Sequence, residues 1–169
     1  NTGKLTGWIA YTLSKSEMQT KGCTPEEVGI NYGDWYSAAY DKPHDLSITA
    51  TYEASPKWTF GAVFNLQSGL PANYPVGRYS YLGKTLPVYS KRNEYRLPTY
   101  HRLDLSATYT PERTNKRWKG EWVFGVYNVY NRKNAVSVSF RENEDTKRNE
   151  AVKLSIFGII PSVTYNFSF

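Results

Sequence analysis

The sequence contains the residue types of a hydrolase, but not in the spacing that such chemistry requires. Ser, His and Asp all occur, yet there is no nucleophile elbow, phosphate-cradling glycine loop or metal-binding helix motif. His44 and His101 both have apolar parity near the ends of predicted strands, with no third ligand at a metal-like spacing, so we assign them structural places. Cys23 is the only cysteine. We therefore expect no enzyme, no catalytic residue, no cofactor and no metal site.

Three charged residues are candidates for a polar interior. Asp45, Arg102 and Asp104 have polar parity in two predicted strands, where their side chains would point away from the apolar face. Charges on such a face commonly pair with one another. We favour ion pairing that fixes the wall of the protein, or a plug that fills its interior, over contact with a substrate.

Aromatic residues gather in two long connecting segments, 16–39 and 70–97. The binding candidates among them are Trp35, Tyr36, Tyr74, Tyr79, Tyr81 and Tyr89. Aromatic faces are platforms for sugars, haem-like rings or protein partners, and they also pack long loops together. Both interpretations stay open.

The formal net charge of +6 does not indicate a nucleic-acid protein. Lys and Arg fall between the apolar-alternating segments, as at Arg113, Lys116 and Arg117, instead of forming a basic stripe with stacking aromatics. We interpret these charges as solvated loop charge and expect no nucleic-acid partner.

Alternation of apolar and polar residues predicts antiparallel β-strands. It is clearest in residues 5–13, 44–53, 57–67, 100–110 and 155–169. Pro161 lacks a backbone donor, and we expect a bulge or an unpaired position there. Aromatic residues make up 16% of the chain, which suits strands.

The connections alternate between short and long, as in bacterial outer-membrane barrels. Residues 54–56 and 111–117 predict tight turns, whereas 16–39 and 70–97 are long. For the last strand to end on the same side as the first begins, residues 131–134 must be a bend inside one strand, 118–140, followed by a charged loop, 141–150. The fold class is all-β: an antiparallel transmembrane β-barrel segment of about six strands.

The apolar faces could pack on a second sheet, but the placement of aromatic residues favours lipid. Tyr52, Trp58, Tyr109 and Trp118 flank the two short turns, as an interfacial girdle would. We expect Leu46, Leu103, Leu105 and Phe167 to face outward, opposite to the three charged candidates. Six strands cannot close around a wet lumen, so the piece has open edges and needs further strands.

Three segments resemble the end of the barrel in TonB-dependent outer-membrane transporters, including relatives of the SusC glycan importers with a carboxypeptidase-like extension. They are YDKPHDL (40–46), RLPTYHRLDL (96–105) and YNVYNRKNA (127–135). The aromatic and apolar C-terminal series looks like the signal by which outer-membrane barrels are delivered for assembly, and its members are Val163, Tyr165, Phe167 and Phe169.

The resemblance covers essentially the whole chain and implies that residues 1–169 are the C-terminal part of a 22-stranded barrel in the bacterial outer membrane. Plug and earlier strands would lie outside this chain, and energised nutrient uptake would use an inner-membrane TonB complex. Partners would be lipid, the other strands, the plug and, in the SusC-like branch, a surface lipoprotein. Cargo stays open among glycans, siderophores, peptides and metal chelates. The alternatives are a passive porin and a barrel-based surface adhesion or assembly protein.

Overall fold

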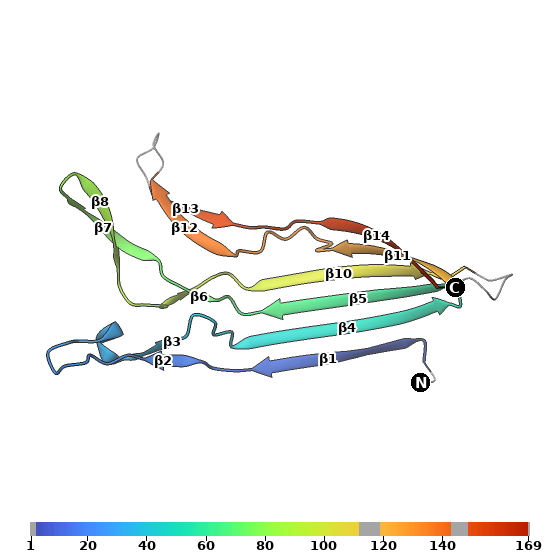
Figure 1. Cartoon of the computed structure of the whole chain (residues 1–169), viewed down its shortest axis with the longest axis horizontal. Helices are drawn as coiled ribbons and strands as arrows, with labels where there is room; N and C mark the ends of the chain where they lie inside the picture. The colour runs from blue at the N-terminus through green and yellow to red at the C-terminus, as the bar shows by residue number, and fades with distance from the viewer. Residues whose placement is uncertain (1–2, 112–118, 143–148, 169) are drawn as a thin grey trace.

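The computed structural model describes residues 3–111, 119–142 and 149–168, and these form an all-β, antiparallel structure. Its main element is a six-stranded sheet in the order β1-β4-β5-β10-β11-β14. The strands are β1 (Leu5–Leu13), β4 (His44–Ser55), β5 (Trp58–Gln67), β10 (Tyr100–Tyr109), β11 (Lys119–Tyr127) and β14 (Ile160–Ser168). No pairing joins β1 to β14 among the described residues, so this sheet is open, as expected (Figure 1).

Four two-stranded antiparallel sheets lie beyond one end of the main sheet, which we name the loop end; the opposite end is the turn end (Figure 1). They pair β2 (Glu17–Gln19) with β3 (Trp35–Ser37), β6 (Pro71–Ala72) with β9 (Tyr95–Arg96), β7 (Pro75–Tyr81) with β8 (Lys84–Tyr89), and β12 (Ser137–Glu142) with β13 (Asn149–Leu154). A short 3-10 turn, η1 (Ile30–Gly33), precedes β3. The segments predicted as long loops therefore contain short strands. Within the described residues, no helix has the length and apolar character needed to cross a membrane.

The strand register separates apolar from polar side chains, because residues directly opposite in an antiparallel pair share a face. Leu46 lies opposite Leu66, Leu103 opposite Phe64, and Leu105 opposite both Ala62 and Val126. The same rule places Phe167, opposite Gly120, on this apolar face. The predicted relative orientation is thus confirmed: these leucines and Phe167 share one face, and Asp45, Arg102 and Asp104 share the other.

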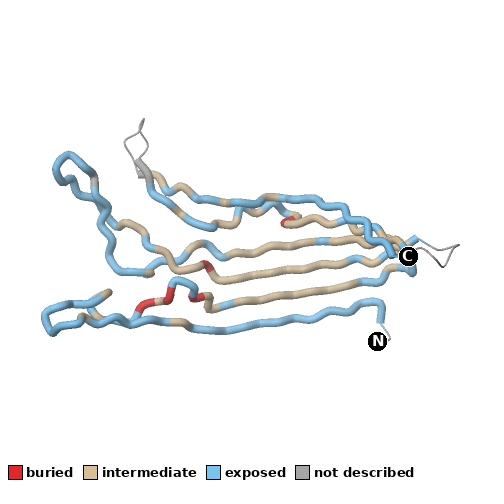
Figure 2. Tube along the Cα trace, viewed as in Figure 1, coloured by how far each residue is buried: buried red, intermediate tan, exposed pale blue. Residues whose placement is uncertain are grey.

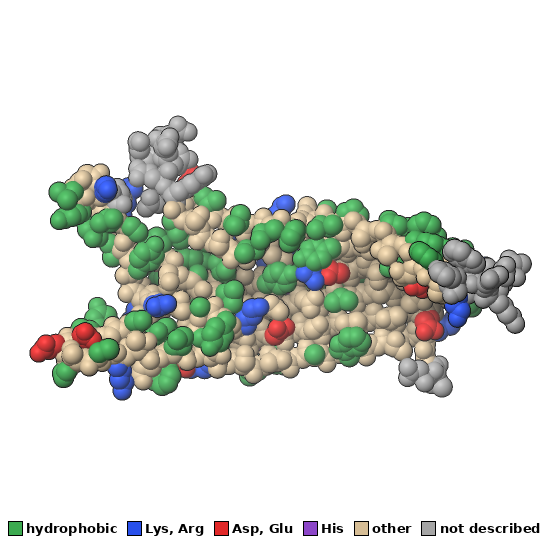
Figure 3. Space-filling view, in the orientation of Figure 1, with side chains coloured by type: hydrophobic (Ala, Val, Ile, Leu, Met, Phe, Trp, Pro, Cys, Tyr) green, Lys and Arg blue, Asp and Glu red, His purple; other side chains and the backbone are tan. Residues whose placement is uncertain are grey.

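The sheet is a single layer without a hydrophobic core. Only five described residues are buried, Tyr36, Ala38, Asp41, Gly69 and Asn128, and all lie toward the loop end (Figure 2). On the apolar face, Ile9 is 72% exposed and Phe124 42%. Figure 3 looks onto the other face, which is mainly neutral polar surface with a few charged side chains. In Figure 1, paired β11 and β14 nearly overlap while β1, β4 and β5 are seen side by side, so the sheet curls.

Aromatic side chains on the apolar face form a row across the turn end. Trp58 lies opposite Tyr109, Tyr109 opposite Trp122, and Trp122 opposite Tyr165. The Trp58 and Tyr109 rings are 4.8 Å apart, and the Trp122 and Tyr165 rings 4.7 Å. Tyr165 also stacks on Phe167. This turn-end aromatic row contains Trp58 and Tyr109 of the predicted girdle, whereas Trp118 and Phe169 lie outside the described residues.

The predicted strand 118–140 is wrong as a single element. β11 ends at Tyr127, and β12 begins only at Ser137 and pairs with β13 instead of the main sheet. The chain does continue in one direction through 131–134 without a hairpin, as expected (Figure 1). The last strand is also shorter than predicted, since β14 starts at Ile160.

The bulge expected at Pro161 is absent, because β11 and β14 pair in continuous register with Val126 opposite Pro161. The Thr110 N–H donates to the Lys57 carbonyl, on the β5 side of β10. N–H groups alternate in direction along a strand, so Leu105 pairs toward β11, and its partner Val126 pairs toward β10 and not toward β14. Its neighbour Pro161 then has its nitrogen on the free side of edge strand β14, where proline is tolerated.

The turn after β4 is tighter than predicted, since β4 continues through Ser55. Ser55 Oγ accepts hydrogen bonds from the backbone N–H groups of Lys57 and Trp58, at 3.3 and 3.1 Å. The other predicted short turn, 111–117, falls almost wholly outside the described residues.

Candidate functional site

Arg102 is the centre of a hydrogen-bonded group on the polar face of the sheet. Its Nε donates to Asp104 Oδ2 at 2.9 Å, and its Nη1 donates to the hydroxyls of Tyr100 at 2.9 Å and Tyr127 at 2.7 Å. The guanidinium carbon also lies 4.1 Å from the centre of the Tyr127 ring. Alternation in β10 turns Tyr100, Arg102 and Asp104 to one side, and Tyr127 reaches them from β11.

Asp45 lies on the same face but belongs to a second group. Its Oδ2 accepts from Gln67 Nε2 at 3.0 Å, and Gln67 Oε1 accepts from Lys42 Nζ at 2.8 Å. Register places Asp45, Gln67 and Tyr100 opposite one another across β4, β5 and β10. The two groups together form a polar belt near the loop end, made of Lys42, Asp45, Gln67, Tyr100, Arg102, Asp104 and Tyr127.

The polar belt joins neighbouring strands of the main sheet to one another. Asp104 uses one oxygen for Arg102 and the other to accept the Asn128 N–H at 2.9 Å, just where β11 ends. Arg102 and Asp104 are each 22% exposed, and charge-assisted bonds in such partly buried places are strong and directional. The geometry agrees with the pairing expected for Arg102 and Asp104, and it shows no nucleophile placed next to a base.

A second network, which we call the rim knot, joins the two long connections above the belt. Arg96 Nη1 donates to the carbonyls of Asp41 at 3.0 Å and Gly69 at 3.2 Å, and Nη2 pairs with the Asp41 carboxylate. The other Asp41 oxygen accepts the Ser16 N–H at 2.7 Å. A side chain at Gly69 would collide with the Leu97 carbonyl, so this crossing requires glycine. The rim knot consists of Ser16, Asp41, Gly69 and Arg96.

The pKa of Asp41 lies below its ordinary value of 3.8. Burial acts to raise the pKa of this carboxyl, which is 1% exposed, but the hydrogen bonds from Arg96 and Ser16 and the charges of Arg96 and Lys15 outweigh it. Asp41 is therefore ionised at neutral pH, and its charge holds the two connections together.

Three asparagines organise the segment where β11 stops. Asn128, which is buried, bonds through its side-chain amide to the backbone N–H and carbonyl of Arg132, both at 3.0 Å. Asn134 does the same to His101, and Asn131 Oδ1 accepts the Ile159 N–H at 3.1 Å. Asn128 and Asn131 have φ of 54°, a region that Asn tolerates. In the segment that connects β11 to β12, these side-chain amides make the hydrogen bonds that backbone groups make within a strand.

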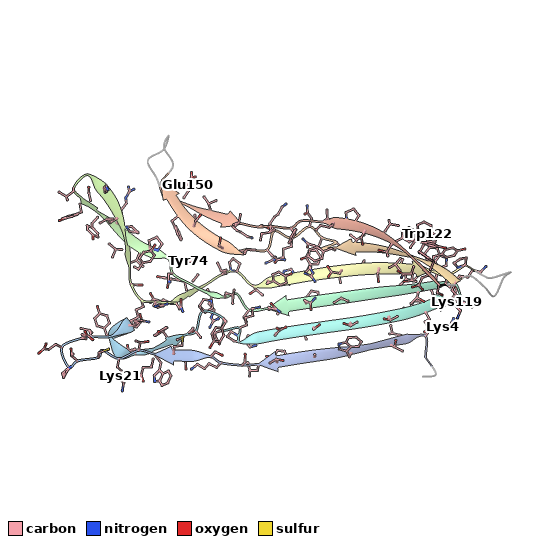
Figure 4. The ribbon with its side chains drawn as sticks, in the orientation of Figure 1. Lys4, Lys21, Tyr74, Lys119, Trp122 and Glu150 are labelled. Atoms are coloured by element: carbon pink, nitrogen blue, oxygen red, sulfur yellow. The ribbon has the colours of Figure 1, made fainter. Side chains whose placement is uncertain are left out.

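The aromatic candidates divide between packing and exposure. Tyr36 is buried, and Tyr74 stacks on Tyr95 and meets Phe140 edge-on, each at 5.3 Å. Figure 4 places Tyr74 where the β7–β8 hairpin leaves the loop end. The other four are more than half exposed: Trp35, Tyr79, Tyr81 and Tyr89. Packing therefore accounts for Tyr36 and Tyr74, and the binding interpretation stays a prediction for the four exposed side chains.

The two histidines lie apart on the apolar face, each beside a tyrosine. His44 Nδ1 and the Tyr11 hydroxyl are 2.8 Å apart, and His101 Nδ1 and the Tyr130 hydroxyl 2.7 Å. In the part of the chain that the structure describes, no three His, Cys, Asp or Glu side chains cluster as a metal site requires. Cys23 is exposed and unpaired.

The assembly candidates are placed as the sequence predicts, as far as they are described. Val163, Tyr165 and Phe167 share the apolar face of β14, opposite Phe124, Trp122 and Gly120. Val163 is 63% exposed and Phe167 59%. Phe169 lies outside the described residues.

The sequence analysis assigned no role to Asp41, Arg96, Gln67, Tyr127 or Asn128. The signal was nevertheless available for four of them, because Asp41, Arg96, Tyr127 and Asn128 fall inside the three segments that resemble the transporter family. Those segments supply most side chains of the polar belt, the rim knot and the asparagine segment.

Comparison of the chain with protein-family models, with curated proteins and with solved structures finds no match.

Proposed function

We propose that this chain forms part of the wall of a bacterial outer-membrane β-barrel, of the TonB-dependent transporter kind, that imports a large solute. The observation that carries the proposal is the two-sided sheet: one unbroken apolar face, exposed and ending in an aromatic row, and one polar face lined by satisfied charges. An apolar surface of this extent requires a partner phase or another layer.

The length of the apolar face supports contact with the hydrocarbon core of a lipid bilayer. Along β10 the chain rises about 27 Å from His101 to Tyr109, at about 3.4 Å per residue. A tilt of about 40° reduces this to about 21 Å, close to the apolar band of about 25 Å in outer-membrane barrels. Tyrosine–histidine pairs at the loop end and the aromatic row at the turn end bound the band, as interfacial residues do.

The asymmetry of the two ends supports the orientation. The described turn between β4 and β5 is tight, whereas the loop end carries long connections with four two-stranded sheets, and bacterial barrels have such long connections on their outer surface. The free edges of β1 and β14 would pair with further strands, because lipid cannot satisfy an unpaired edge. The plug, the TonB complex and a surface lipoprotein are the partners that the family resemblance implies.

The lipid-facing side can be tested by spin labels in the complete gene product, reconstituted in lipid, on a Cys23→Ser background. Labels at Leu103 and Leu105 should be relaxed by oxygen, which dissolves in lipid, and labels at Ser106 and Thr108 by a water-soluble nickel chelate. Reversed accessibility on β10 and one other strand would overturn the membrane proposal.

Transport needs a separate measurement, since a wall can belong to a porin or an adhesin. Uptake of the native solute by cells should stop when the inner-membrane energy-transducing complex is deleted, while the amount of folded barrel stays constant. Undiminished uptake would identify a passive porin, and surface binding without uptake would identify an adhesion protein.

A further inference from the structure

The two long connections at the loop end carry opposite charge. Residues 14–43 contain three basic side chains, Lys15, Lys21 and Lys42, against five acidic ones, Glu17, Glu26, Glu27, Asp34 and Asp41. Residues 68–97 contain five basic side chains, Arg78, Lys84, Lys91, Arg92 and Arg96, against Glu94 alone. Part of the positive charge of residues 68–97 is neutralised by residues 14–43. Arg96 pairs with Asp41, and Lys91 Nζ lies 3.5 Å from Asp34 Oδ2.

Arg92 is held in place without a carboxylate partner among the described residues. The Asn31 side chain makes two hydrogen bonds to the Arg92 backbone. Asn31 Oδ1 accepts from the Arg92 N–H at 2.7 Å, and Asn31 Nδ2 donates to the Arg92 carbonyl at 3.1 Å. The guanidinium carbon lies 5.9 Å from the ring centre of buried Tyr36. A cation fixed in this way loses little freedom when it binds an anion.

Arg92 lines a depression of about 360 Å³ together with Asn73, Tyr89, Ser90 and Lys91. The Asn73 Oδ1 is taken by the Asn93 N–H at 2.6 Å, which leaves its amide nitrogen directed to other acceptors. Ser90 Oγ bonds to Glu94. The Tyr89 ring is 53% exposed. The site thus combines two cations, an amide donor and an accessible aromatic face.

We propose that this depression binds a carboxylate-bearing solute, an inference that rests on the proposed role of the loop end in solute capture. The Arg92 fork receives the carboxylate in bidentate fashion, and Lys91 adds its charge while sharing it with Asp34. The Asn73 amide donates to a neighbouring oxygen of the solute. The apolar face of the solute stacks on the Tyr89 ring. A neutral solute would leave Arg92 without a counter-charge in the occupied site.

The test is equilibrium binding to the complete gene product in detergent micelles, which requires no uptake and so stands independently of transport. The probes are an oligogalacturonate, which bears carboxylates on sugar rings, a neutral oligogalactose of equal length, and citrate. Arg92→Gln should weaken oligogalacturonate binding by about tenfold or more, and Arg92→Lys by less, because a lysine keeps the charge but not the fork.

A matched control and a variant of opposite sign sharpen the result. Lys84→Gln removes the same charge from the tip of the β7–β8 hairpin, outside the depression, and should leave affinity unchanged. Asp34→Asn removes the competitor of Lys91 and should tighten binding by about threefold at low salt. These opposed effects separate the site from a general loss of folding.

The probes also resolve the source of the carboxylate. Binding of oligogalacturonate but not citrate, lost in Tyr89→Ala, supports an acidic saccharide, whereas equal Arg92-dependent binding of both supports small carboxylates. Equal affinity for the neutral oligosaccharide, or equal losses in Arg92→Gln and Lys84→Gln, would overturn the proposal.

Discussion

At the residue scale, ionised side chains here form joints between segments distant in sequence. Asp41 and Arg96 are 55 residues apart, and Arg102 and Tyr127 are 25 apart, yet each pair is hydrogen-bonded. Such bonds gain strength where water is partly excluded, and losing one partner leaves the other unsatisfied. The cost of a substitution should therefore depend on the partner left behind.

Asp41→Asn should release the two long connections from each other. Arg96 keeps its carbonyl acceptors but loses the carboxylate, and we expect local opening to become easier by about 2 kcal/mol, because Arg96 is one-third exposed. Hydrogen exchange of the Ser16 and Ala38 amides measures this opening. Asp34→Asn, which removes an exposed pair, should leave their protection unchanged; equal loss of protection in both variants would contradict the role of the rim knot.

The pH dependence of the same contact follows from the lowered pKa of Asp41. A carboxyl with a folded pKa below its unfolded value stabilises the folded state above the unfolded pKa, and this stabilisation is lost as pH falls through the folded pKa. Protection of the Ser16 amide should thus persist at pH 5 and decline below the ordinary value of 3.8. In Asp41→Asn that decline should be absent; an unchanged pH profile would show that another group controls it.

Arg102→Gln should lower the thermal stability of the proposed barrel more than Asp45→Asn. The first change leaves Asp104 without its guanidinium and Tyr127 without its cation, whereas the second keeps an acceptor for Gln67. We expect a loss of about 2–3 kcal/mol against less than about 1 kcal/mol. Heat-modifiable gel mobility across a temperature series compares them, and the reverse order would contradict the assignment of the belt.

At the element scale, alternation sufficed to predict the strands but not their interruptions. Leu46, Ile48, Ala50 and Tyr52 repeat with period two, and β4 presents them on one face. The break between β11 and β12 left no trace in periodicity, because it depends on asparagine amides substituting for backbone partners. The Asp41–Arg96 contact was equally hidden, since no spacing rule joins two irregular segments.

The pairing of β11 with β14 depends on Gly120. A Cβ at this position would lie 2.2 Å from the Tyr165 hydroxyl and 2.9 Å from its Cζ, so the ring must move. Gly120→Ala should displace Tyr165 from Trp122 and lower the amount of folded barrel, with a stability loss of about 1–3 kcal/mol. Gly77→Ala in β7 is the matched control, because nothing lies within 4 Å there. Equal folding of both variants would show that the ring adapts freely.

At the scale of the whole molecule, the proposed bilayer supplies what the sheet lacks. Among the described residues no second layer covers the apolar face, so the proposal makes the free energy of placing a charge there depend on lipid. Leu105 lies midway between the turn-end aromatic row and His101 along β10. This position should be among the most sensitive to charge.

Leu105→Arg should destabilise the folded protein by about 2–4 kcal/mol in lipid, whereas Thr108→Arg on the polar face should cost less than about 1 kcal/mol. Urea unfolding of the complete gene product in thin-bilayer vesicles measures both. Equal costs would indicate that both faces of β10 meet water or protein, and would contradict the lipid-facing assignment.

The orientation of Pro161 affects how further strands can complete the proposed barrel. Its nitrogen faces the free edge of β14, so any strand that docks there finds one carbonyl of its own without a donor. A strand from another protein molecule would also lack a donor at Pro161. The free edge of β14 is therefore a poor template for edge-to-edge aggregation. When the next strand of the proposed barrel pairs with β14, this strand pair has one backbone hydrogen bond fewer at the level of Pro161 than the other strand pairs have. That height is the natural place for the wall to part first under mechanical or thermal stress.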